Sequence, residues 1–451
     1  MASNRSICAI LRRCNKAKGA RMLFSDIGII DEDFRFKPHC WVGTRGDRIS
    51  YVGDKPPVDA GGYGEVYPGG GRLLMPGMFN AHAHSAMTIL RGYGEAMPLQ
   101  AWLNDRIWPF EAKMTPEDNY WGTVLACAEM LRYGTVGFTD MYYATELRFK
   151  AADEAGMKIN ACEGLLAFEE KPYREYPLFK LNEDLLRYHG ASDGRLRLDV
   201  CIHGEYTSNP LTCRGAAEYA AERGLRMHLH ASETELETEE CKQRHGGMTP
   251  IAYFNSLGVF GNPTTAAHCV WLEDEDFAIL REAGVTVATC PVSNMKLGSG
   301  FAPVKRMLAE GVQVALGTDG CSSNNNHDMF QDAYTMALAT CGSTRDAAAI
   351  TPAQVLFAAT RAGALSQGRD DCGLVKEGFK ADLCVLDASG PSWSPATDMV
   401  ANAVYAGHGS DVCLTMVDGS VRYRDGAWSG IDVERAMAEC SATVERIEGA
   451  L

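Results

Sequence analysis

The 451-residue sequence lacks any apolar run that approaches the ~20 residues of a transmembrane helix. It also lacks an excess of basic residues: Asp and Glu number 58 against 43 Lys and Arg, and the formal net charge is -15. Binding to phosphates requires concentrated lysine and arginine, so this balance argues against nucleic acid as the main partner. We therefore expect neither a membrane nor a nucleic acid as the partner of this protein.

The sixteen cysteines include no C-x-x-C pair, and they are spread from Cys8 to Cys440. This distribution favours free thiols in a reducing cytoplasm over a disulfide framework. The first 24 residues hold six basic residues and no acidic one, but their apolar stretch at 7–11 is too short for a signal peptide. We interpret residues 1–21 as an N-terminal extension of a cytoplasmic protein.

The two ends of the sequence differ in pattern from its middle, and no internal repeat or low-complexity segment is present. Residues 47–53 and 383–386 are typical of short strands, and an Asp-Gly pair at 418–419 between two apolar runs is a strong hairpin signal. We expect the segments 22–74 and 376–451 to form a small β-sandwich domain together.

Between residues 75 and 375, short apolar strands alternate with helical stretches, which implies a parallel sheet. Six or more such units favour a closed (β/α)8 TIM barrel as the catalytic domain. An open doubly wound sheet is the alternative, but no G-x-G-x-x-G follows a first strand. We predict strands at 136–139, 198–203, 227–230, 266–269, 285–290 and 312–318, and helices at 119–133, 213–223, 273–283 and 329–339.

Histidines gather at the ends of the predicted strands. His82 and His84 are two residues apart, so both imidazoles project from one face of a strand. In a barrel, catalytic groups come from the C-terminal ends of different strands. Five of the eleven histidines end strands in this way, and one aspartate does the same. These residues are His82, His84, His203, His230, His268 and Asp319.

The motifs around these residues resemble those of the amidohydrolase superfamily. The matching stretches are 74–84 (LMPGMFNAHAH), 230–234 (HASET), 267–269 (AHC), 290–300 (CPVSNMKLGSG), 317–320 (GTDG) and 373–383 (GLVKEGFKADL). The sequence is most similar to the branch that contains 5'-methylthioadenosine/S-adenosylhomocysteine deaminases and triazine chlorohydrolases, and the resemblance covers nearly all residues after Met22.

The resemblance implies a metal centre. It assigns His82, His84, His230 and Asp319 to one divalent metal ion per chain, with zinc first and iron or manganese as alternatives. Imidazole and carboxylate ligands with a position left for water are typical of a catalytic site. Binuclear relatives use a modified lysine from the fourth strand, where this sequence has His203, so we expect a single ion. His228 could compete with His230, which we prefer because it lies nearer the end of its strand.

The resemblance also implies hydrolytic deamination of an adenine ring. Asp319 would accept a proton from the attacking water, Glu233 would protonate the ring nitrogen, and His268 would hydrogen-bond the attacking oxygen. For the substrate, a small purine nucleoside, the resemblance assigns Glu111 to the ribose hydroxyls and His203 to the purine edge, and His268 again contacts the reacting ring. We add Trp102 as a pocket residue.

Glu163 departs from the family pattern. Deaminases that accept S-adenosylhomocysteine commonly place an arginine after the third strand, where this sequence has glutamate. A carboxylate facing the carboxylate of that substrate would be unfavourable, so Glu163 would favour 5'-methylthioadenosine, 5'-deoxyadenosine or adenosine. In the alternative interpretation Glu163 points elsewhere, or Arg174 replaces the arginine.

Other functions on the same scaffold stay open. They are deamination of aminofutalosine or guanine, dechlorination of a triazine, and a catalytically inactive, assembly-forming role. Glu111 favours a ribosyl substrate, and the complete set of metal ligands argues against an inactive relative. The oligomeric state, a homo-oligomer included, is not decided by the sequence. The H-x-E at 203–205 lacks the P-C-x-x-C of the other zinc deaminase fold, so we treat it as a coincidence.

Overall fold

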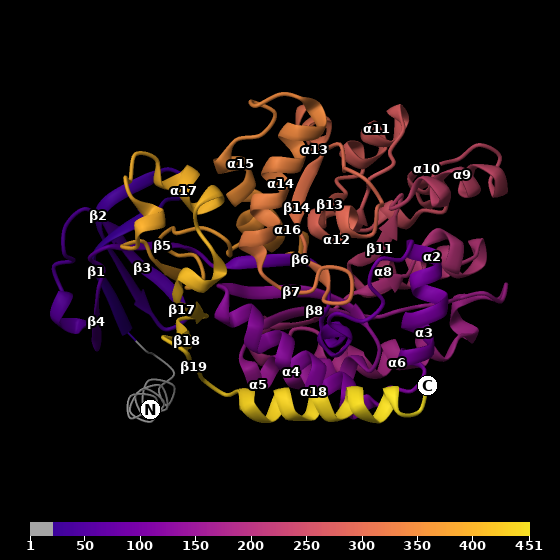
Figure 1. Cartoon of the computed structure of the whole chain (residues 1–451), viewed down its shortest axis with the longest axis horizontal. Coiled ribbons are helices and arrows are strands. Elements are labelled where there is room, and N and C mark those ends of the chain that lie inside the picture. Colours follow the sequence, from indigo (N-terminus) through magenta and orange to yellow (C-terminus); the bar gives the residue numbers. More distant parts are fainter. Residues whose placement is uncertain (1–20) are drawn as a thin grey trace.

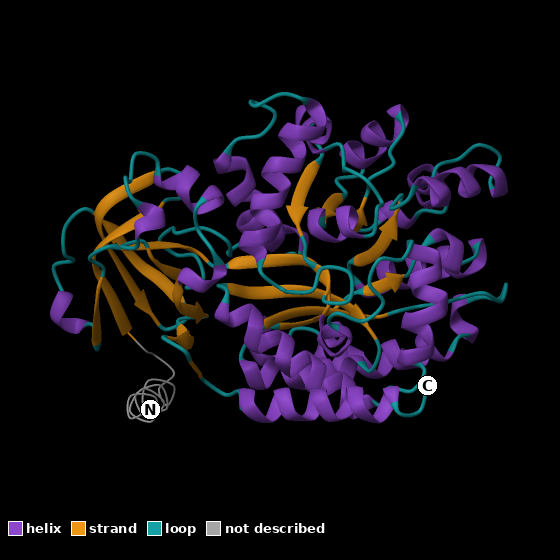
Figure 2. Ribbon diagram, in the orientation of Figure 1, coloured by secondary structure: helices purple, strands orange, loops and turns teal. Residues whose placement is uncertain are grey.

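The computed structural model describes residues 21–451 and shows two β-rich regions side by side (Figure 1). A sheet made from both ends of the chain lies at one side, and parallel strands surrounded by helices form the larger part (Figure 2). Within residues 21–451 no helix has the length and apolar character that crossing a membrane requires. The predicted extension at 1–21 falls almost entirely outside the described residues.

The terminal segments form one nine-stranded sheet in the order β19-β18-β17-β16-β5-β1-β2-β3, with β4 paired to β1. The predicted strands at 47–53 and 383–386 and the predicted hairpin are confirmed, since Val417 pairs with Ser420 across the Asp-Gly turn. The strands are β1 (Arg21–Ile30), β2 (Phe36–Arg45), β3 (Arg48–Gly53), β4 (Glu65–Pro68), β5 (Arg72–Pro76), β16 (Leu383–Asp387), β17 (Val412–Val417), β18 (Ser420–Arg424) and β19 (Ala427–Trp428).

The two central strands of this sheet, β5 and β16, are buried on both faces. In β5, Leu74 packs into a core that belongs to the terminal sheet, whereas Leu73 and Met75 pack into the main core of the molecule. Alternate side chains of a strand point to opposite faces, so the terminal sheet packs into its own core on one face and against the main core of the molecule on the other. This burial explains the continuous apolar sequence of β5 and β16.

The middle of the chain forms two five-stranded parallel sheets, in the orders β15-β6-β7-β8-β9 and β10-β11-β12-β13-β14. The predicted strand–helix alternation and parallel pairing are confirmed. The strands are β6 (Met78–His84), β7 (Thr135–Tyr142), β8 (Lys158–Glu163), β9 (Leu196–Leu198), β10 (Val200–Ile202), β11 (Met227–Ala231), β12 (Thr264–His268), β13 (Thr286–Thr289), β14 (Gln313–Leu316) and β15 (Asp319–Gly320).

Two of the predicted strands are divided between the two sheets. The strand predicted at 198–203 becomes β9 and β10, because the Asp199 N–H donates to Ala161 O and the Val200 N–H donates to Arg226 O. The strand predicted at 312–318 ends as β14, and the chain then joins the other sheet as β15. At both places one segment of chain links the two sheets.

The four predicted helices are present with small shifts at their ends: α4 (Pro116–Arg132), α8 (Pro210–Arg223), α11 (Asp274–Glu282) and α14 (Met329–Thr344). Helix α4 begins earlier than predicted because Thr115 and Asp118 form a capping box there. Residues 99–111, which we call the cover segment, consist of α2 (Leu99–Trp102), a π-helical turn (Leu103–Ile107) and α3 (Trp108–Glu111).

A last helix, α18 (Val433–Glu448), follows β19 and returns to pack along α4 (Figure 1). Its buried residues include Cys440 and Ile447. These two side chains belong to the same apolar cluster as the cover segment. The C-terminal helix therefore leaves the terminal sheet and becomes part of the helical layer around the parallel strands.

Candidate active site

Three imidazoles meet at the ends of β6 and β11. His82 and His84 come from β6, and His230 comes from β11. Each ring is oriented by a hydrogen bond at Nδ1, which leaves Nε2 to face the shared space. These bonds join His82 Nδ1 to His228 Nε2 (2.8 Å), His84 Nδ1 to Met141 O (2.5 Å) and His230 Nδ1 to His203 O (2.7 Å).

The carboxylate of Asp319 completes this group from β15. Its Oδ1 lies 3.3 Å from His82 Nε2 and 3.1 Å from His84 Nε2. Its Oδ2 accepts hydrogen bonds from Ser293 Oγ (2.6 Å) and Ser323 Oγ (2.7 Å). Burial alone would raise the pKa of Asp319, but the bonds to His82 and His84 hold it well below its usual value. One oxygen is thus fixed by the protein while the other faces the imidazoles.

The arrangement of ring nitrogens fits a bound cation. His84 Nε2 and His230 Nε2 lie 3.4 Å apart, and both rings use Nδ1 on a backbone carbonyl, so Nε2 is the atom of each ring that is left to bind an ion. Burial alone would lower the pKa of His84, but its hydrogen bond to Asp319 raises it to about 9, so a bound ion would take the place of a proton on this ring. His82 Nε2 is buried and lies 3.3 Å from Asp319 Oδ1, and burial lowers the pKa of His82 to about 4. Neutral imidazoles and one carboxylate are the donors that a catalytic zinc, iron or manganese ion prefers.

Glu233 and His268 lie beside this group. The Glu233 and Ser232 N–H groups donate to the two carboxylate oxygens of Glu237, at 2.7 and 3.1 Å, which fixes the turn after β11. His268 Nε2 is 3.7 Å from Glu233 Oε2, and its Nδ1 is 2.9 Å from Asn294 Oδ1. Burial raises the pKa of Glu233, which makes its protonated form more accessible near neutral pH.

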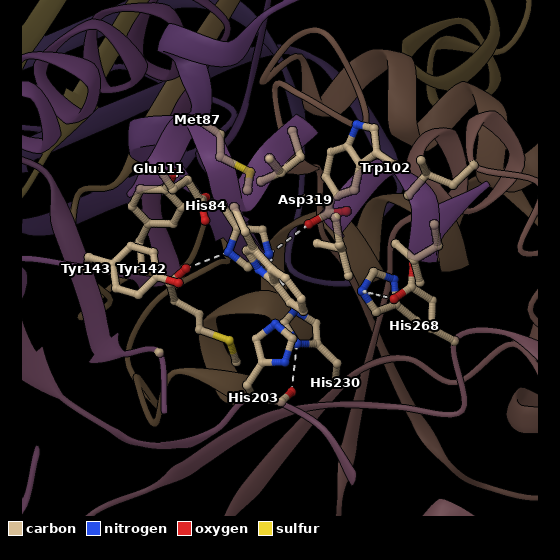
Figure 3. A pocket seen from close by; sticks show the side chains of 18 of the residues that line it. His84, Met87, Trp102, Glu111, Tyr142, Tyr143, His203, His230, His268 and Asp319 are labelled. Atoms are coloured by element: carbon tan, nitrogen blue, oxygen red, sulfur yellow. Dashed lines mark hydrogen bonds and ion pairs between the residues drawn. The ribbon is translucent and has the colours of Figure 1, made fainter. Parts of the chain in front are cut away.

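A single cavity connects these groups with the cover segment (Figure 3). Glu111 lies on the opposite side of His84 from His268 (Figure 3), and the Tyr142 hydroxyl donates to its Oε1 at 2.5 Å. Burial raises the pKa of Glu111 to about 7. The predicted residues that line the cavity are His84, Trp102, Glu111, His203, His230, Glu233, His268 and Asp319, and His82 lies directly behind them.

Glu163 does not lie in this cavity, which is lined by its neighbour Gly164. Its carboxylate accepts hydrogen bonds from the Ala144 N–H (3.1 Å), the Thr145 N–H (3.0 Å) and Thr145 Oγ1 (2.6 Å). Arg174 is not in the cavity either, because it pairs with Glu222 on the surface. The substrate contact predicted for Glu163 is therefore not part of the site. Sequence spacing could not reveal that this carboxylate caps a neighbouring turn.

The structure gives roles to residues for which the sequence analysis had assigned none or another. His228, which the sequence analysis weighed as a competing ligand, has its Nε2 on His82 Nδ1, and Tyr142 holds Glu111. Asn294 orients His268, and it lies in a stretch that already resembled a family motif. Tyr142 carried no comparable signal, because a tyrosine in a buried strand is indistinguishable from a core residue.

A second group of possible ligands lies at Glu205, Cys241 and His245. Arg244 forms two hydrogen bonds with the Glu205 carboxylate, at 3.1 and 2.5 Å, and His245 Nε2 lies 2.7 Å from its Oε1. Both carboxylate oxygens are thus already paired with cationic or donor groups. The H-x-E at 203–205 is accounted for by this ion pair.

Comparison with known proteins places the geometry in context. Residues 73–422 match the model of the amidohydrolase family. The chain is 40% identical over 409 residues to the 5-methylthioadenosine/S-adenosylhomocysteine deaminase of Moorella thermoacetica, covering 90% of this chain and 94% of the relative. It is 39% identical over 377 residues to the 5'-deoxyadenosine deaminase of Methanosarcina mazei, covering 84% and 87%.

Two solved structures have a similar fold. The adenosine deaminase from Xanthomonas campestris with bound zinc superposes with a TM-score of 0.88 at 28% identity, over 95% of this chain and 98% of the other. The atrazine chlorohydrolase from Arthrobacter aurescens, complexed with zinc, gives a TM-score of 0.87 at 22% identity, over 94% and 100%. The second likeness shows the fold alone.

Proposed function

This chain belongs to the amidohydrolase family, and we propose that it is a hydrolytic deaminase of adenine nucleosides that releases ammonia and the corresponding inosine. Its substrates are drawn from adenosine, 5'-deoxyadenosine, 5'-methylthioadenosine and S-adenosylhomocysteine. The observation that carries the proposal is a buried histidine–aspartate group and an acid, Glu233, in one cavity with the carboxylate of Glu111. Guanine and triazine substrates have no comparable use for Glu111, because they lack a ribose diol.

We propose that His82, His84, His230 and Asp319 hold one divalent ion, with zinc as the first expectation. When bound, such an ion supplies Lewis-acid activation of water near neutral pH. The convergence of His84 Nε2 and His230 Nε2, which lie 3.4 Å apart, supports this assignment, because in both rings the backbone hydrogen bond is made by Nδ1 and Nε2 is left to bind an ion. The solved relative with bound zinc supports zinc over iron or manganese.

The chain's own residues then move the protons. We propose that Asp319 accepts a proton from the attacking water, with its other oxygen held by Ser293 and Ser323. Glu233, whose pKa is raised by burial, donates a proton to the ring nitrogen beside C6, so that charge does not accumulate on the ring. The water oxygen bonds to C6, and the amino group takes up the proton that Asp319 removed from the water. The bond from C6 to the amino group then breaks and ammonia leaves, while the oxygen stays on C6 and its remaining proton returns to Glu233. His268 hydrogen-bonds this oxygen from beside Glu233.

We propose that Glu111 binds the ribose of the substrate. A carboxylate can accept hydrogen bonds from both hydroxyls of a vicinal diol, and Tyr142 orients it for this contact. His203 faces the purine edge, and Trp102 forms part of the apolar wall. The deaminases named among the relatives act on nucleosides, which agrees with this placement.

We also propose that the two parallel sheets form one closed (β/α)8 barrel, because β9–β10 and β14–β15 link them at both ends. The nine-stranded sheet would then be the predicted β-sandwich, with its own core, and the domain limits of 22–74 plus 376–451 and 75–375 remain predictions. Cytoplasmic location also remains a prediction, and the free thiols of residues 21–451 support it.

The experiment is an assay of the purified, metal-loaded chain for ammonia release, with chloride release measured in addition for the triazine. The panel contains the four adenine nucleosides, guanine, aminofutalosine and a chlorotriazine. Turnover of at least one adenine nucleoside with the highest kcat/KM of the panel is expected. Guanine, aminofutalosine or the triazine as the best substrate would replace the proposal.

A further inference from the structure

Helix α18 holds the turn that follows Glu111. Arg446 Nη1 donates a hydrogen bond to Lys113 O at 3.3 Å, and its Nη2 pairs with Asp118 Oδ2 at 2.5 Å. Thr443 Oγ1 donates to Asp118 Oδ1 at 2.7 Å. The C-terminal end of α18 accordingly lies next to α3 (Figure 1). Residues far apart in the sequence are joined here by three polar contacts.

Asp118 connects α18 to the backbone of the turn that follows Glu111. It is largely buried, and its Oδ2 also accepts hydrogen bonds from the Thr115 N–H (2.6 Å) and Thr115 Oγ1 (2.7 Å). The Met114 N–H donates to Glu111 O at 3.0 Å. A continuous series of hydrogen bonds and short backbone links therefore runs from α18 to the residue that we place at the ribose.

Apolar packing supports the same connection. Ile447 and Cys440 of α18 are buried in one cluster with the cover segment. The members of this cluster from the cover segment are Leu99, Trp102, Leu103, Ile107 and Phe110. Leu99, Trp102, Leu103 and Ile107 also line the cavity. The same apolar cluster thus contains residues of α18 and residues that line the cavity.

Helix α18 lies beyond residues 73–422, which match the family model. It contributes no residue to the cavity lining. Three of its hydrogen bonds nevertheless reach Lys113 and Asp118, on either side of the point where α4 begins after Glu111. A carboxylate must be held within about 0.5 Å to accept two hydroxyl hydrogen bonds well. Binding of the diol should thus depend on a helix that never touches the substrate.

We propose that helix α18 positions the cover segment for nucleoside binding, with Arg446 and Thr443 as positioning residues that act through Asp118 on Glu111. The inference rests on the proposed function, and specifically on Glu111 as the contact to the ribose diol. Loss of these contacts moves Glu111 away from the diol and weakens the binding of ribosides. It leaves the metal ligands and Glu233 in place, since these come from the strand ends.

The test compares ligands with and without the diol on the metal-loaded, full-length enzyme. Dissociation constants for the products inosine and 2',3'-dideoxyinosine are measured by quenching of tryptophan fluorescence, since Trp102 and Trp108 line the cavity. In Arg446→Ala the preference for inosine should fall about three- to tenfold, as expected for one lost positioning hydrogen bond. The kcat for adenosine should stay within about twofold of wild type.

Control variants separate positioning from general stability. Arg435→Ala is the matched change on the same helix, where Arg435 pairs with Glu439 and lies over Trp121 of α4, and it should keep the wild-type preference. Arg446→Lys should retain most of the preference, and Thr443→Val should reduce it in the same direction as Arg446→Ala.

The outcomes distinguish the two proposals. A folded Arg446→Ala enzyme that keeps the full preference, or that binds both ligands equally more weakly, overturns the role of α18. A wild-type enzyme with no preference for inosine removes Glu111 from the diol, and with it the basis of the inference. A wild-type enzyme that deaminates no adenine nucleoside contradicts the proposed function itself.

Discussion

The two ends of the parallel strands bury charged groups in opposite ways. At the start of β8, Lys158 Nζ lies 2.5 Å from Asp382 Oδ1 and 2.7 Å from Asp418 Oδ1, which joins the parallel strands to the terminal sheet. At the other end, Nε2 of His84 and Nε2 of His230 lie 3.4 Å apart, and Asp319 Oδ1 lies 3.1 Å from the first of them. The first end pairs Lys158 with two carboxylates, whereas the second gathers the donor atoms that we propose hold a metal ion.

This difference separates a structural end from a functional end. A buried ion pair that loses one partner leaves an uncompensated charge, so a substitution there should lower the free energy of unfolding. A cluster of donor atoms that faces a ligand contributes to binding and chemistry, so a substitution there should lower the activity. Substitutions at the two ends should therefore affect different measured quantities.

The largest expected effect is at the metal ligands. Asp319→Ala should remove the bound metal and reduce turnover to background, because the carboxylate is both a proposed ligand and the proposed proton acceptor. Elemental analysis and ammonia release measure the two losses, and wild type should hold one equivalent per chain. Two equivalents per active chain, or an active enzyme without metal, would contradict the single-ion site.

Glu233→Gln should keep the metal and lower kcat by about 10²–10⁴-fold, the usual contribution of a general acid–base group. The change leaves every proposed ligand untouched, so metal content serves as the internal control. Activity within about threefold of wild type would remove Glu233 from the mechanism.

At the opposite end, Lys158→Met should lower the free energy of unfolding by about 3–5 kcal/mol, because Asp382 and Asp418 lose their shared partner. Denaturant unfolding measures this change, and the kcat of the folded fraction should equal that of wild type. A large fall in kcat without a loss of stability would contradict the structural role that we give to the Lys158 end.

Glu111→Ala should raise the KM for adenosine by about 10- to 100-fold, equivalent to about 1.5–3 kcal/mol for charge-assisted hydrogen bonds. A nucleoside without the diol, dideoxyadenosine with both ribose hydroxyls removed, should be affected much less, because it cannot make these bonds. Steady-state kinetics with both nucleosides provide the comparison. Equal losses for the two would show that Glu111 does not contact the ribose.

The smallest effect should come from Glu163→Gln. The carboxylate caps the Ala144–Thr145 turn, so we expect a loss of about 1 kcal/mol in stability and an unchanged ratio of rates for 5'-methylthioadenosine and S-adenosylhomocysteine. Thermal unfolding and paired kinetics test both points. A shift in that ratio would show that Glu163 does affect which substrate is preferred.

Much of this architecture could be predicted from local sequence patterns. Alternating apolar strands and helices indicate parallel sheets, and the ends of parallel strands meet at one edge, so His84, His230 and Asp319 were expected to converge. The division of the predicted strand at 198–203 was not expected, because a change of sheet depends on which neighbouring backbone is free to accept a hydrogen bond.

The identity of the chemical groups and their order along the strands were determined by the sequence alone, because strand periodicity fixes which side chains share a face. Only the tertiary structure decided which atoms those side chains present. His228 fixes the ring of His82, Tyr142 holds Glu111, and Glu163 turns away from the cavity to cap a neighbouring turn. Such partners depend on packing between distant segments, and local pattern carries no information about them.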